Sequence, residues 1–550
     1  MWRKRVKIGG MHCADCARRI ERLSTSNNGI GVEVSFAAKL AEFSGSNQAD
    51  SDRIVQNIEA MGFTVESIET SESEIESKAH KPLHIAIIGS GSAAFACAIG
   101  AAETGARVTM IERSPVIGGT CVNVGCIPSK IMVRAAYHAH LQNGPGYPGI
   151  ESARPTVNFK ALASMQRHQV DSLRASKYEE VLAGQPNIRL IRGDARFIQD
   201  DCLIVRGPDG SDSKIGADRF LIATGSAPYI PPIPGLAETP YWTSNEAVHA
   251  EKLPTHLIVI GSGIVALELS QAFLRLGSRV TLVTRRGLLR NEDEAIGQTL
   301  RQILEGEGMR IVTDARLQSV RFFKRRIRLD RFAVEIGSEV LYGDRLLVAT
   351  GRRPNTADLD LRKAGVQVDR VGAILVDDRL RTRNWNIFAA GDCTDLPKYV
   401  YVAAASGARA AINMTGGDSP LDLAVMPKVI FTDPPVATVG FSESTARNAD
   451  IQPEVRLLRL EHIARAIVDR STEGFIKLVV NKSTHELIGA QIVAPAAGDL
   501  IQTVALAIRN RMTVSEIGAQ LFPYLTMVEG IKLCAQSFSK DIRKLSCCAG

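Results

Sequence analysis

The sequence predicts a multidomain α/β protein, and three observations support this prediction. An apolar strand, a glycine-rich turn, a helix and a second strand follow one another from Leu83, and the same series returns from Thr255. Residues 1–68 show strand and helix patterns in the order β-α-β-β-α-β. From about Pro427 onward, strand patterns such as "GFIKLVV" precede a helical stretch, which is typical of a separate α+β domain.

Length and composition indicate a globular protein of several domains. At about 100–200 residues per domain, 550 residues with 45% hydrophobic and 23% charged residues suggest three or four domains. The net charge of +7 is spread along the chain without a block of like charges, which argues against nucleic acid as a partner. The uncharged run Ile85–Ala102 is interrupted by Gly-Ser-Gly-Ser, so we expect a strand, a turn and a buried helix there and no stable membrane insertion. The basic N-terminus lacks an apolar export signal, so a cytoplasmic location is expected.

Residues 1–68 are expected to form a small ferredoxin-like domain. Strands are predicted at "RKRVKIGG", "GVEVSF", "LAEFSG" and "FTVES", and helices from Ala14 to about Leu23 and over "SDRIVQNIEAMG". Residues 69–82, "ETSESEIESKAHKP", are rich in Ser and Glu and poor in large apolar residues, so we expect a flexible linker.

The first repeat predicts a nucleotide-binding turn. In "IIGSGSAAFA", Gly89 and Gly91 permit a tight turn that brings backbone N–H groups near a pyrophosphate at the helix N-terminus, and Ala94 is the third small residue. Glu112 ends the next strand and can accept hydrogen bonds from a ribose diol. Because "FLIATGSAP" and "LLVATGRRP" follow the two repeats in turn, both are predicted to be Rossmann-like domains that bind one nucleotide each.

The second repeat differs from the first where a ribose would lie. Its small residues are Gly261, Gly263 and Ala266. Thr284 stands in the place of the acidic residue, and Arg285 and Arg286 follow it. An acid that would repel a 2′-phosphate is missing and guanidinium groups that can bind one are present, so the pattern favours NADPH over NADH. The alternative is a solvated basic turn.

Ten cysteines are too few for a disulfide scaffold, but six of them form three close pairs: Cys13/Cys16, Cys121/Cys126 and Cys547/Cys548. Paired thiols in a chain without an export signal indicate metal or redox chemistry in a reducing compartment. Adjacent Cα atoms, about 3.8 Å apart, are too close for an ordinary disulfide, so the terminal pair is expected to be free thiols or an accidental feature of a disordered tail. The remaining residues, Cys97, Cys202, Cys393 and Cys534, are expected to be structural.

The string "GGTCVNVGCIPSK" is the most specific motif in the chain. Cys121 and Cys126 can approach one another if Cys126 opens a helix, and a helix N-terminus lowers the pKa of a thiol. Together with the glycine repeats and "IFAAGDCTD", this string resembles the pyridine nucleotide-disulfide oxidoreductases over roughly residues 83–540.

The resemblance implies an FAD site, an NAD(P)H site and a homodimer. By resemblance, the FAD site comprises Gly89, Gly91, Ala94, Glu112, Gly119, Thr120, Lys130, Gly225 and Asp392, and the NADPH site comprises Gly261, Gly263, Ala266, Arg285 and Arg286. Cys126 is the thiol implied to touch the flavin, Asp392 is implied to accept from its ribityl chain, and Lys130 and Glu268 are implied to pair near flavin and nicotinamide. The implied ranges are FAD-binding 83–254 and 346–426, NADPH-binding 255–345, dimerisation 427–540 and a metal-relay tail 541–550.

The segment "FPYLTMVEG" departs from the disulfide reductases of this family. These enzymes carry a His-Pro here that reaches in from the other subunit as a general acid, whereas this chain has Tyr524 and Leu525 and keeps Glu529. Without an imidazole that titrates near neutral pH, thiol–disulfide interchange loses its proton donor. The difference argues against glutathione or dihydrolipoamide as substrate.

The N-terminal "GGMHCADCA" resembles heavy-metal-associated domains. A stable zinc site wants four ligands, whereas Cys13 and Cys16 offer two thiolates and His12 is expected in an exposed loop. Two thiolates suffice for a soft ion with linear coordination, which leaves Cu(I) and Hg(II). Of these, Hg(II) takes up the electron pair that a reduced flavin delivers.

The expected reaction is therefore NADPH-dependent reduction of Hg(II), supplied as thiol complexes, to Hg(0). Cys547 and Cys548 are expected to catch the ion and pass it by thiol exchange to Cys121 and Cys126. By resemblance, Tyr178 and the partner subunit's Tyr524 lie beside the inner thiols. The alternatives are a dihydrolipoamide- or glutathione-type disulfide reductase and a non-catalytic soft-metal chaperone.

Overall fold

The computed structural model describes residues 2–10, 20, 31–35, 39–45, 49–72, 82–143, 147–153, 155–324 and 331–541. Within the chain, Met1–Pro82 and Leu83–Gly550 form two compact units. Outside the described residues lie Cys13, Cys16, Cys547 and Cys548, as well as His12 and nearly all of the predicted helix 14–23 and of the tail 541–550. No helix in the described part of the chain is long and apolar enough to cross a membrane.

The described strands of the N-terminal unit have the sheet order of the predicted ferredoxin-like domain. Its antiparallel sheet consists of β1 (Trp2–Gly9), β2 (Gly31–Ser35), β3 (Leu40–Gly45) and β4 (Thr64–Glu72) in the order β2-β3-β1-β4. The helix α3 (Ala49–Ala60) connects β3 to β4. Apolar residues that alternate along the strands pack against this helix, because alternate strand positions share one face of a sheet. These residues include Val6, Ile8 and Phe43, which lie in one core with Ile58 of α3.

The strand β4 is longer than the sequence predicts. A linker was expected from residue 69 onward, but β4 continues to Glu72. Its last residues pair with β1, Glu69 opposite Arg5 and Glu72 opposite Trp2. Backbone hydrogen bonds between strands do not require apolar side chains, so composition alone does not reveal this extension. The strand therefore includes residues 69–72 of the predicted linker.

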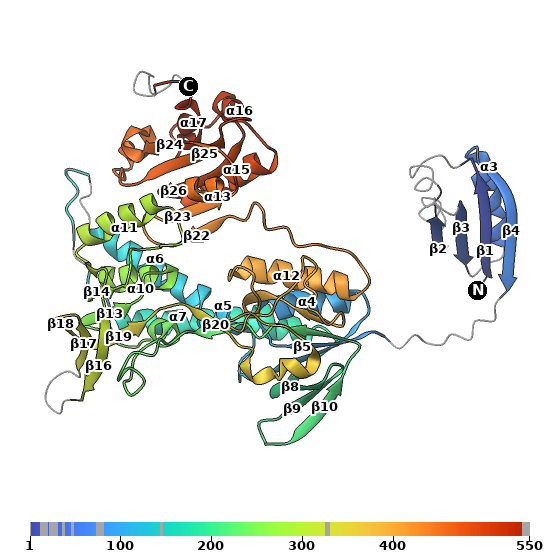
Figure 1. Ribbon diagram of the computed structural model, residues 1–550, viewed down its shortest axis with the longest axis horizontal. Coiled ribbons are helices and arrows are strands. Elements are labelled where there is room, and N and C mark those ends of the chain that lie inside the picture. Colours follow the sequence, from blue (N-terminus) through green and yellow to red (C-terminus); the bar gives the residue numbers. More distant parts are fainter. Residues whose placement is uncertain are drawn as a thin grey trace. The chain divides into compact units, whose positions relative to one another are not determined.

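The first repeat forms a parallel sheet with the strand order β21-β11-β5-β6-β7. Its strands are β5 (His84–Ile88), β6 (Arg107–Glu112), β7 (Ile188–Arg192), β11 (Arg219–Ile222) and β21 (Ile387–Ala389). The helices α4 (Ser92–Glu103) and α12 (Val400–Met414) lie side by side next to this sheet (Figure 1). The uncharged run Ile85–Ala102 is thus a strand, a turn and a buried helix, as predicted.

The segment between β6 and β7 carries the inner thiol pair on helices. These are α5 (Gly119–Asn123), α6 (Cys126–Asn143) and α7 (Phe159–Arg174), which continues through a π-helical turn (Ala175–Glu179) into α8 (Glu180–Ala183). A smaller antiparallel sheet follows, formed by β8 (Asp194–Gln199), β9 (Cys202–Arg206) and β10 (Asp212–Gly216). The ribbon of β12 (Ser226–Pro228) and β20 (Arg352–Pro354) and the helix α9 (Ser244–Val248) lie in the connections to and from the second repeat.

The second repeat forms a parallel sheet with the order β15-β14-β13-β19. Its elements are β13 (His256–Ile260), α10 (Ile264–Arg275), β14 (Arg279–Val283), α11 (Glu294–Gly306), β15 (Arg310–Val312) and β19 (Arg345–Val348). An antiparallel sheet of β16 (Leu317–Phe323), β17 (Arg331–Ile336) and β18 (Glu339–Gly343) precedes β19. The predicted boundary at residue 345 is too early, because β19 pairs with β13 and so belongs to this domain through Val348.

The C-terminal domain is an antiparallel sheet with the order β22-β23-β26-β25-β24. Its strands are β22 (Lys428–Ile430), β23 (Val436–Gly440), β24 (Pro453–Arg459), β25 (Phe475–Asn481) and β26 (Leu487–Val493). The described helices of this domain are α13 (Glu443–Asn448), α14 (Ala464–Val468), α15 (Ala497–Arg509), α16 (Val514–Ala519) and α17 (Glu529–Gln536). This is the α+β domain that the sequence predicts.

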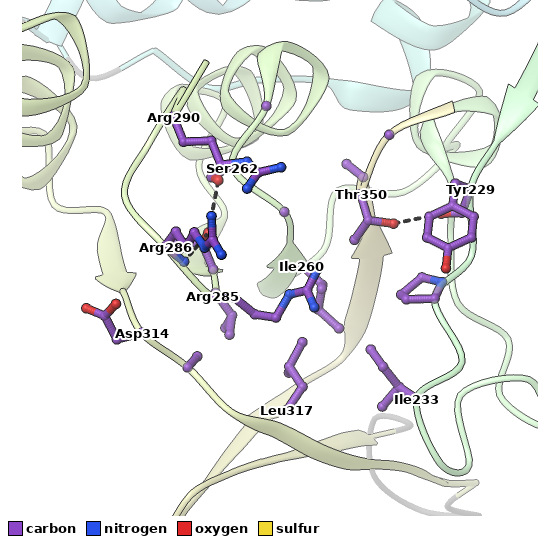
Figure 2. Close-up of a pocket in the computed structure, with 18 of the residues that line it drawn as sticks. Tyr229, Ile233, Ile260, Ser262, Arg285, Arg286, Arg290, Asp314, Leu317 and Thr350 are labelled. Atoms are coloured by element: carbon purple, nitrogen blue, oxygen red, sulfur yellow. Dashed lines mark hydrogen bonds between the residues drawn. The ribbon is translucent and has the colours of Figure 1, made fainter. Parts of the chain in front are cut away.

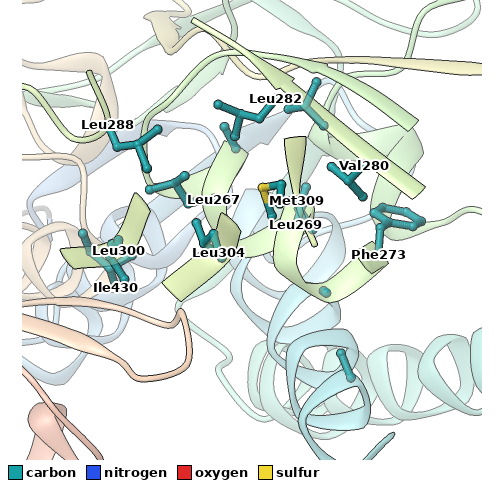
Figure 3. Packing of buried hydrophobic residues seen from close by; sticks show 14 of the residues in the cluster. Leu267, Leu269, Phe273, Val280, Leu282, Leu288, Leu300, Leu304, Met309 and Ile430 are labelled. Atoms are coloured by element: carbon teal, nitrogen blue, oxygen red, sulfur yellow. The ribbon is translucent and has the colours of Figure 1, made fainter. Parts of the chain in front are cut away.

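One apolar core joins the second repeat to the C-terminal domain. Leu288, Leu300 and Leu304 of the second repeat lie in the same buried cluster as Ile430 and Phe475 of the C-terminal domain (Figure 3). Burying apolar surface across a domain boundary opposes movement of the two domains, because separation would expose that surface to water.

We expect the substitution Gly407→Ala to destabilise the first repeat. A Cβ atom at Gly407 in α12 would lie 2.1 Å from the carbonyl oxygen of Ala93 in α4, so the two helices would have to separate. Overpacking of this kind costs roughly 1–3 kcal/mol. Scanning calorimetry should show a lower unfolding temperature. Gly306→Ala is the control, because a Cβ there meets nothing within 4 Å; equal unfolding temperatures for the two variants would contradict the expectation.

Candidate active site

The inner thiols lie on two consecutive helices of the first repeat. Cys121 is in α5, Cys126 is the first residue of α6, and both are half-buried free thiols. The hydrogen bond from Cys121 and, less strongly, the charge of Lys130 lower the pKa of Cys126 to about 7, although burial acts in the opposite direction. The same hydrogen bond and burial raise the pKa of Cys121 above its ordinary value. Near neutral pH Cys126 is therefore partly ionised, whereas Cys121 keeps its proton.

Lys130 connects the thiol pair to the second repeat. It follows Cys126 by one helical turn, and its Nζ donates to Oε2 of Glu268 in α10 over 2.6 Å. The Lys130 side chain is 33% exposed and that of Glu268 only 4%. The other oxygen of Glu268 accepts from the backbone N–H of Phe431 at 2.9 Å. The two residues that the resemblance pairs thus lie together, and the carboxylate is fixed by contacts from both sides.

Tyr178 lies near the thiol pair on the π-helical turn. Its ring packs edge to face against Phe95, with ring centroids 4.9 Å apart, and its hydroxyl bonds to Ser92. Burial, and to a smaller extent the neighbouring Cys121, raise the pKa of Tyr178 above its ordinary value. The turn Ala175–Glu179 is π-helical, and π-helical turns are frequent at functional sites.

A buried amide and an arginine hold this region together, and sequence reasoning missed both. Asn123 donates to the carbonyl oxygens of Ile117 and Gly119 over 2.8 and 2.9 Å. Arg174, the last residue before the π-helical turn, donates to Asn123 over 3.1 Å. Asn123 stands inside the cysteine string itself, but nothing local in the sequence indicates its contact with Arg174.

Tyr524 and Glu529 belong to the C-terminal domain, whereas the thiol pair belongs to the first repeat. Tyr524 is 51% exposed, and Glu529 is the first residue of α17. The structure describes a single chain, and Tyr524 is predicted to reach the thiol pair from a second subunit.

The glycine turn of the first repeat leaves the N-terminus of α4 open. A Cβ at Gly89 (φ +115°) would lie 2.3 Å from the carbonyl oxygen of Ala223, and one at Gly119 (φ +63°) would lie 2.6 Å from Cα of Gly91. Only glycine permits these close approaches. Glu112 accepts from the Ser90 hydroxyl over 2.6 Å at the end of β6. A cradle of backbone N–H groups with a carboxylate at its rim fits a dinucleotide of the FAD type.

The predicted ribityl contact, Asp392, is held by two neighbours that the sequence did not identify. Ser226 donates from Oγ to Oδ2 of Asp392 over 2.7 Å, and Arg352 donates from Nε to the same Ser226 oxygen over 2.7 Å. Gly225 precedes Ser226 with a φ of +67° and open space where a Cβ would stand. The remaining predicted FAD residues are on helices around this cradle, Ala94 in α4 and Thr120 in α5.

The second repeat has an equivalent turn and a large cavity. A Cβ at Gly261 (φ +133°) would lie 2.2 Å from the carbonyl oxygen of Ala349, which matches Gly89 and Ala223 in the first repeat. The cavity has a volume of about 1160 Å³, and it is lined by Gly261, Ser262, Gly263, Thr284, Arg285, Arg286 and Arg290 among others. Ala266 is buried in α10, which begins beside the cavity.

Three arginines surround one end of this cavity. Figure 2 shows Arg285, Arg286 and Arg290 around Ser262, with Tyr229 at the other end. Thr284 donates to Ser262 over 2.9 Å, in the position where the first repeat has Glu112 bonded to Ser90. A positive end without a carboxylate at that position fits a nucleotide with a 2′-phosphate. Arg290 was not among the predicted NADPH residues, because it lies beyond the end of the strand that the glycine motif predicts.

Comparison with known families agrees with this architecture. Residues 83–407 match the family model described as pyridine nucleotide-disulphide oxidoreductase, and residues 426–535 match the dimerisation domain of that family. The chain belongs to the pyridine nucleotide-disulphide oxidoreductase family. Residues 5–64 match the heavy-metal-associated domain, which includes the positions of Cys13 and Cys16. Family membership implies FAD and a nicotinamide nucleotide as cofactors, and the two glycine cradles fit both.

The chain is similar to several mercuric reductases along almost its whole length. It is 48% identical to the mercuric reductase of Acidithiobacillus ferrooxidans, covering 99% of this chain and 98% of that protein. It is also 48% identical to that of Shigella flexneri, covering 99% and 100%. The mercuric reductase of Streptomyces lividans is 42% identical and aligns over all of its length with 86% of this chain.

Solved structures of family members share the fold. The HOCl-induced flavoprotein disulfide reductase RclA from Escherichia coli has a TM-score of 0.74 at 30% identity, covering 83% of this chain and 100% of that one. LpdA from Mycobacterium tuberculosis has a TM-score of 0.73 at 29% identity, with the same coverage.

We expect the substitution Lys130→Gln to raise the pKa of Cys126 towards the ordinary thiol value. It removes the cation that stabilises the thiolate and leaves Glu268, whose charge acts in the opposite direction. The rate of alkylation of the reduced protein at neutral pH should fall several-fold, and the pH profile should move to higher pH. Lys363→Gln, which removes an exposed ion pair with Asp360, is the control. An unchanged profile in the Lys130 variant would show that the lysine does not stabilise the thiolate.

Proposed function

We propose that the protein reduces Hg(II) to Hg(0), with NADPH as the electron donor and FAD as the electron carrier, and that it acts as a cytoplasmic homodimer. The observation that carries the proposal is the pair of free thiols Cys121 and Cys126 on consecutive helices, with the pKa of Cys126 lowered to about 7. Two adjacent sulfur ligands suit a soft ion that accepts linear coordination. The similarity to mercuric reductases over 99% of the chain points to the same ion.

The chemistry requires two thiolates and one electron pair. The Cys126 thiolate displaces one thiolate from the Hg(II) complex, and Cys121 then displaces the second and gives up its proton to a departing thiolate, because a coordinating thiol is deprotonated. FAD, when bound, carries the electron pair of the nicotinamide to the ion. With Hg(II) supplied as a complex of two thiolates, the balance is Hg(SR)₂, NADPH and one proton to Hg(0), NADP⁺ and two RSH. Weak binding of Hg(0) by thiolates then frees the pair for the next ion.

Lys130 and Tyr178 are proposed to tune the thiol pair. The ammonium of Lys130 favours the Cys126 thiolate, and its ion pair with Glu268 fixes it at the side of the second repeat. The hydroxyl of Tyr178, which stays protonated because its pKa is raised, is proposed to orient or ligate the ion together with the partner subunit's Tyr524. Glu529 is proposed to serve the same site from the partner.

Two outer thiol pairs are proposed to deliver the ion. Cys547 and Cys548 would take Hg(II) from thiol complexes and pass it inward by exchange, and Cys13 and Cys16 would bind it on the heavy-metal-associated domain. The mercuric reductase of Streptomyces lividans aligns over its whole length with 86% of this chain. This supports an accessory role for the part of this chain that the alignment leaves out.

The decisive test is NADPH oxidation that depends on Hg(II) in the presence of excess thiol. We expect NADPH consumption to match the release of volatile mercury mole for mole, and we expect Cys126→Ala to abolish both. The competing function is a disulfide reductase. NADPH oxidation with lipoamide or glutathione disulfide, but not with Hg(II), would establish that function instead.

We expect Arg285 and Arg286 to make NADPH the preferred nucleotide. Charge-assisted hydrogen bonds are worth about 1.5–3 kcal/mol each, so Arg285→Gln with Arg286→Gln should lower the preference for NADPH over NADH by more than about tenfold. The measurement is kcat/KM for both nucleotides. Arg301→Gln is the control, since its exposed pair with Glu305 lies on α11. Equal use of NADPH and NADH by the unmodified protein would refute the assignment.

A further inference from the structure

The loop that carries the three arginines is fixed from outside its own domain. Residues 284–293 connect β14 to α11, and Arg285, Arg286 and Arg290 in this loop line the nucleotide cavity (Figure 2). An arginine on a mobile loop binds phosphate weakly, because ordering the loop costs conformational entropy at the moment of binding. The contacts that order this loop therefore bear on nucleotide affinity.

The C-terminal end of the loop is held by a buried ion pair. Asp293 caps α11, with Oδ1 accepting from the backbone N–H of Ala295 at 3.1 Å. Its Oδ2 accepts from Nζ of Lys477 in β25 at 2.7 Å. The side chains of Lys477 and Asp293 are 10% and 8% exposed. Breaking a buried pair leaves an uncompensated charge, so this contact opposes movement of the loop away from the C-terminal domain.

The loop has a second set of contacts with the C-terminal domain. Glu292 lines the cavity and accepts from Nζ of Lys428 at 3.2 Å and from the Thr438 hydroxyl at 3.4 Å. Leu288 and Leu289 are buried in the apolar core that also contains Ile430, Phe475 and Val493 of the C-terminal domain. Figure 3 shows Leu288 and Ile430 in this core. The loop therefore lies between the cavity on one side and the C-terminal domain on the other.

We propose that Lys477 is a positioning residue for the 2′-phosphate of NADPH, acting through Asp293 and assisted by Lys428. It holds the loop in the arrangement that places the arginines at the phosphate, so the C-terminal domain contributes to nucleotide selectivity without touching the nucleotide. This inference rests on the proposed use of NADPH. If the Lys477–Asp293 pair only supported the fold, its loss would weaken the binding of NADPH and NADH alike. In the proposed role, its loss weakens only the part of the affinity that comes from the 2′-phosphate.

The test compares Lys477→Met with the unmodified holoenzyme, using NADPH and NADH as separate donors. If the loop holds the productive arrangement for only a tenth of the time, apparent affinity falls about tenfold. The KM for NADPH should rise by about that factor, with unchanged kcat at saturation, unchanged flavin content and an unchanged KM for NADH. The same substitution should have no further effect in a protein that also carries Arg285→Gln, Arg286→Gln and Arg290→Gln.

A second variant guards against a simple folding defect. Asp293→Asn keeps a side-chain oxygen for the helix cap and removes the ion pair, while Lys477 retains Glu443 at 4.0 Å. It should reproduce the rise in the KM for NADPH, and Arg301→Gln on the same helix should not. A normal preference for NADPH in both Lys477→Met and Asp293→Asn, or an equal loss for both nucleotides, would overturn this inference alone. An unmodified protein without a preference would overturn the NADPH proposal and this inference with it.

Discussion

A single proton shared by two sulfur atoms sets the chemistry of this site. Cys126 begins α6 and carries negative charge because Cys121 donates to it and Lys130 lies one turn along the helix. Moving Cys121 away would raise the pKa of Cys126, and a protonated thiol is a poorer ligand for a soft ion than a thiolate. The surrounding helices, including the π-helical turn with Tyr178 and the Asn123–Arg174 contact, hold the two sulfur atoms in this relation.

The two repeats share the same backbone arrangement at their glycine turns. In each, a glycine with positive φ packs against a carbonyl oxygen of a neighbouring segment, Gly89 against Ala223 and Gly261 against Ala349. The repeats differ at the strand end, where Glu112 of the first is replaced by Thr284 in the second. A tight turn therefore defines where a pyrophosphate lies, and the residues just beyond the following strand define which ribose is accepted.

Features that depend on local geometry were predictable from the sequence, and features that depend on distant partners were not. The glycine turns, the domain order and the thiol pair follow from spacing, since each is built within a few residues. The last residues of β4 and the placement of β19 depend on pairing with β1 and β13, which no local pattern reveals. The same holds for side chains: Lys477 and Asp293 are 184 residues apart in the chain.

The central claim is that Cys121 and Cys126 together bind Hg(II). The direct measurement is X-ray absorption spectroscopy at a mercury edge, on holoenzyme with reduced thiols and oxidised FAD, without NADPH, carrying alanine at Cys13, Cys16, Cys547 and Cys548 and loaded with one equivalent of Hg(II). The account predicts a mercury ion that stays bound through gel filtration in competing thiol, with two sulfur neighbours. Loss of the ion, or the same spectrum when Cys121 is also replaced by alanine, would contradict it.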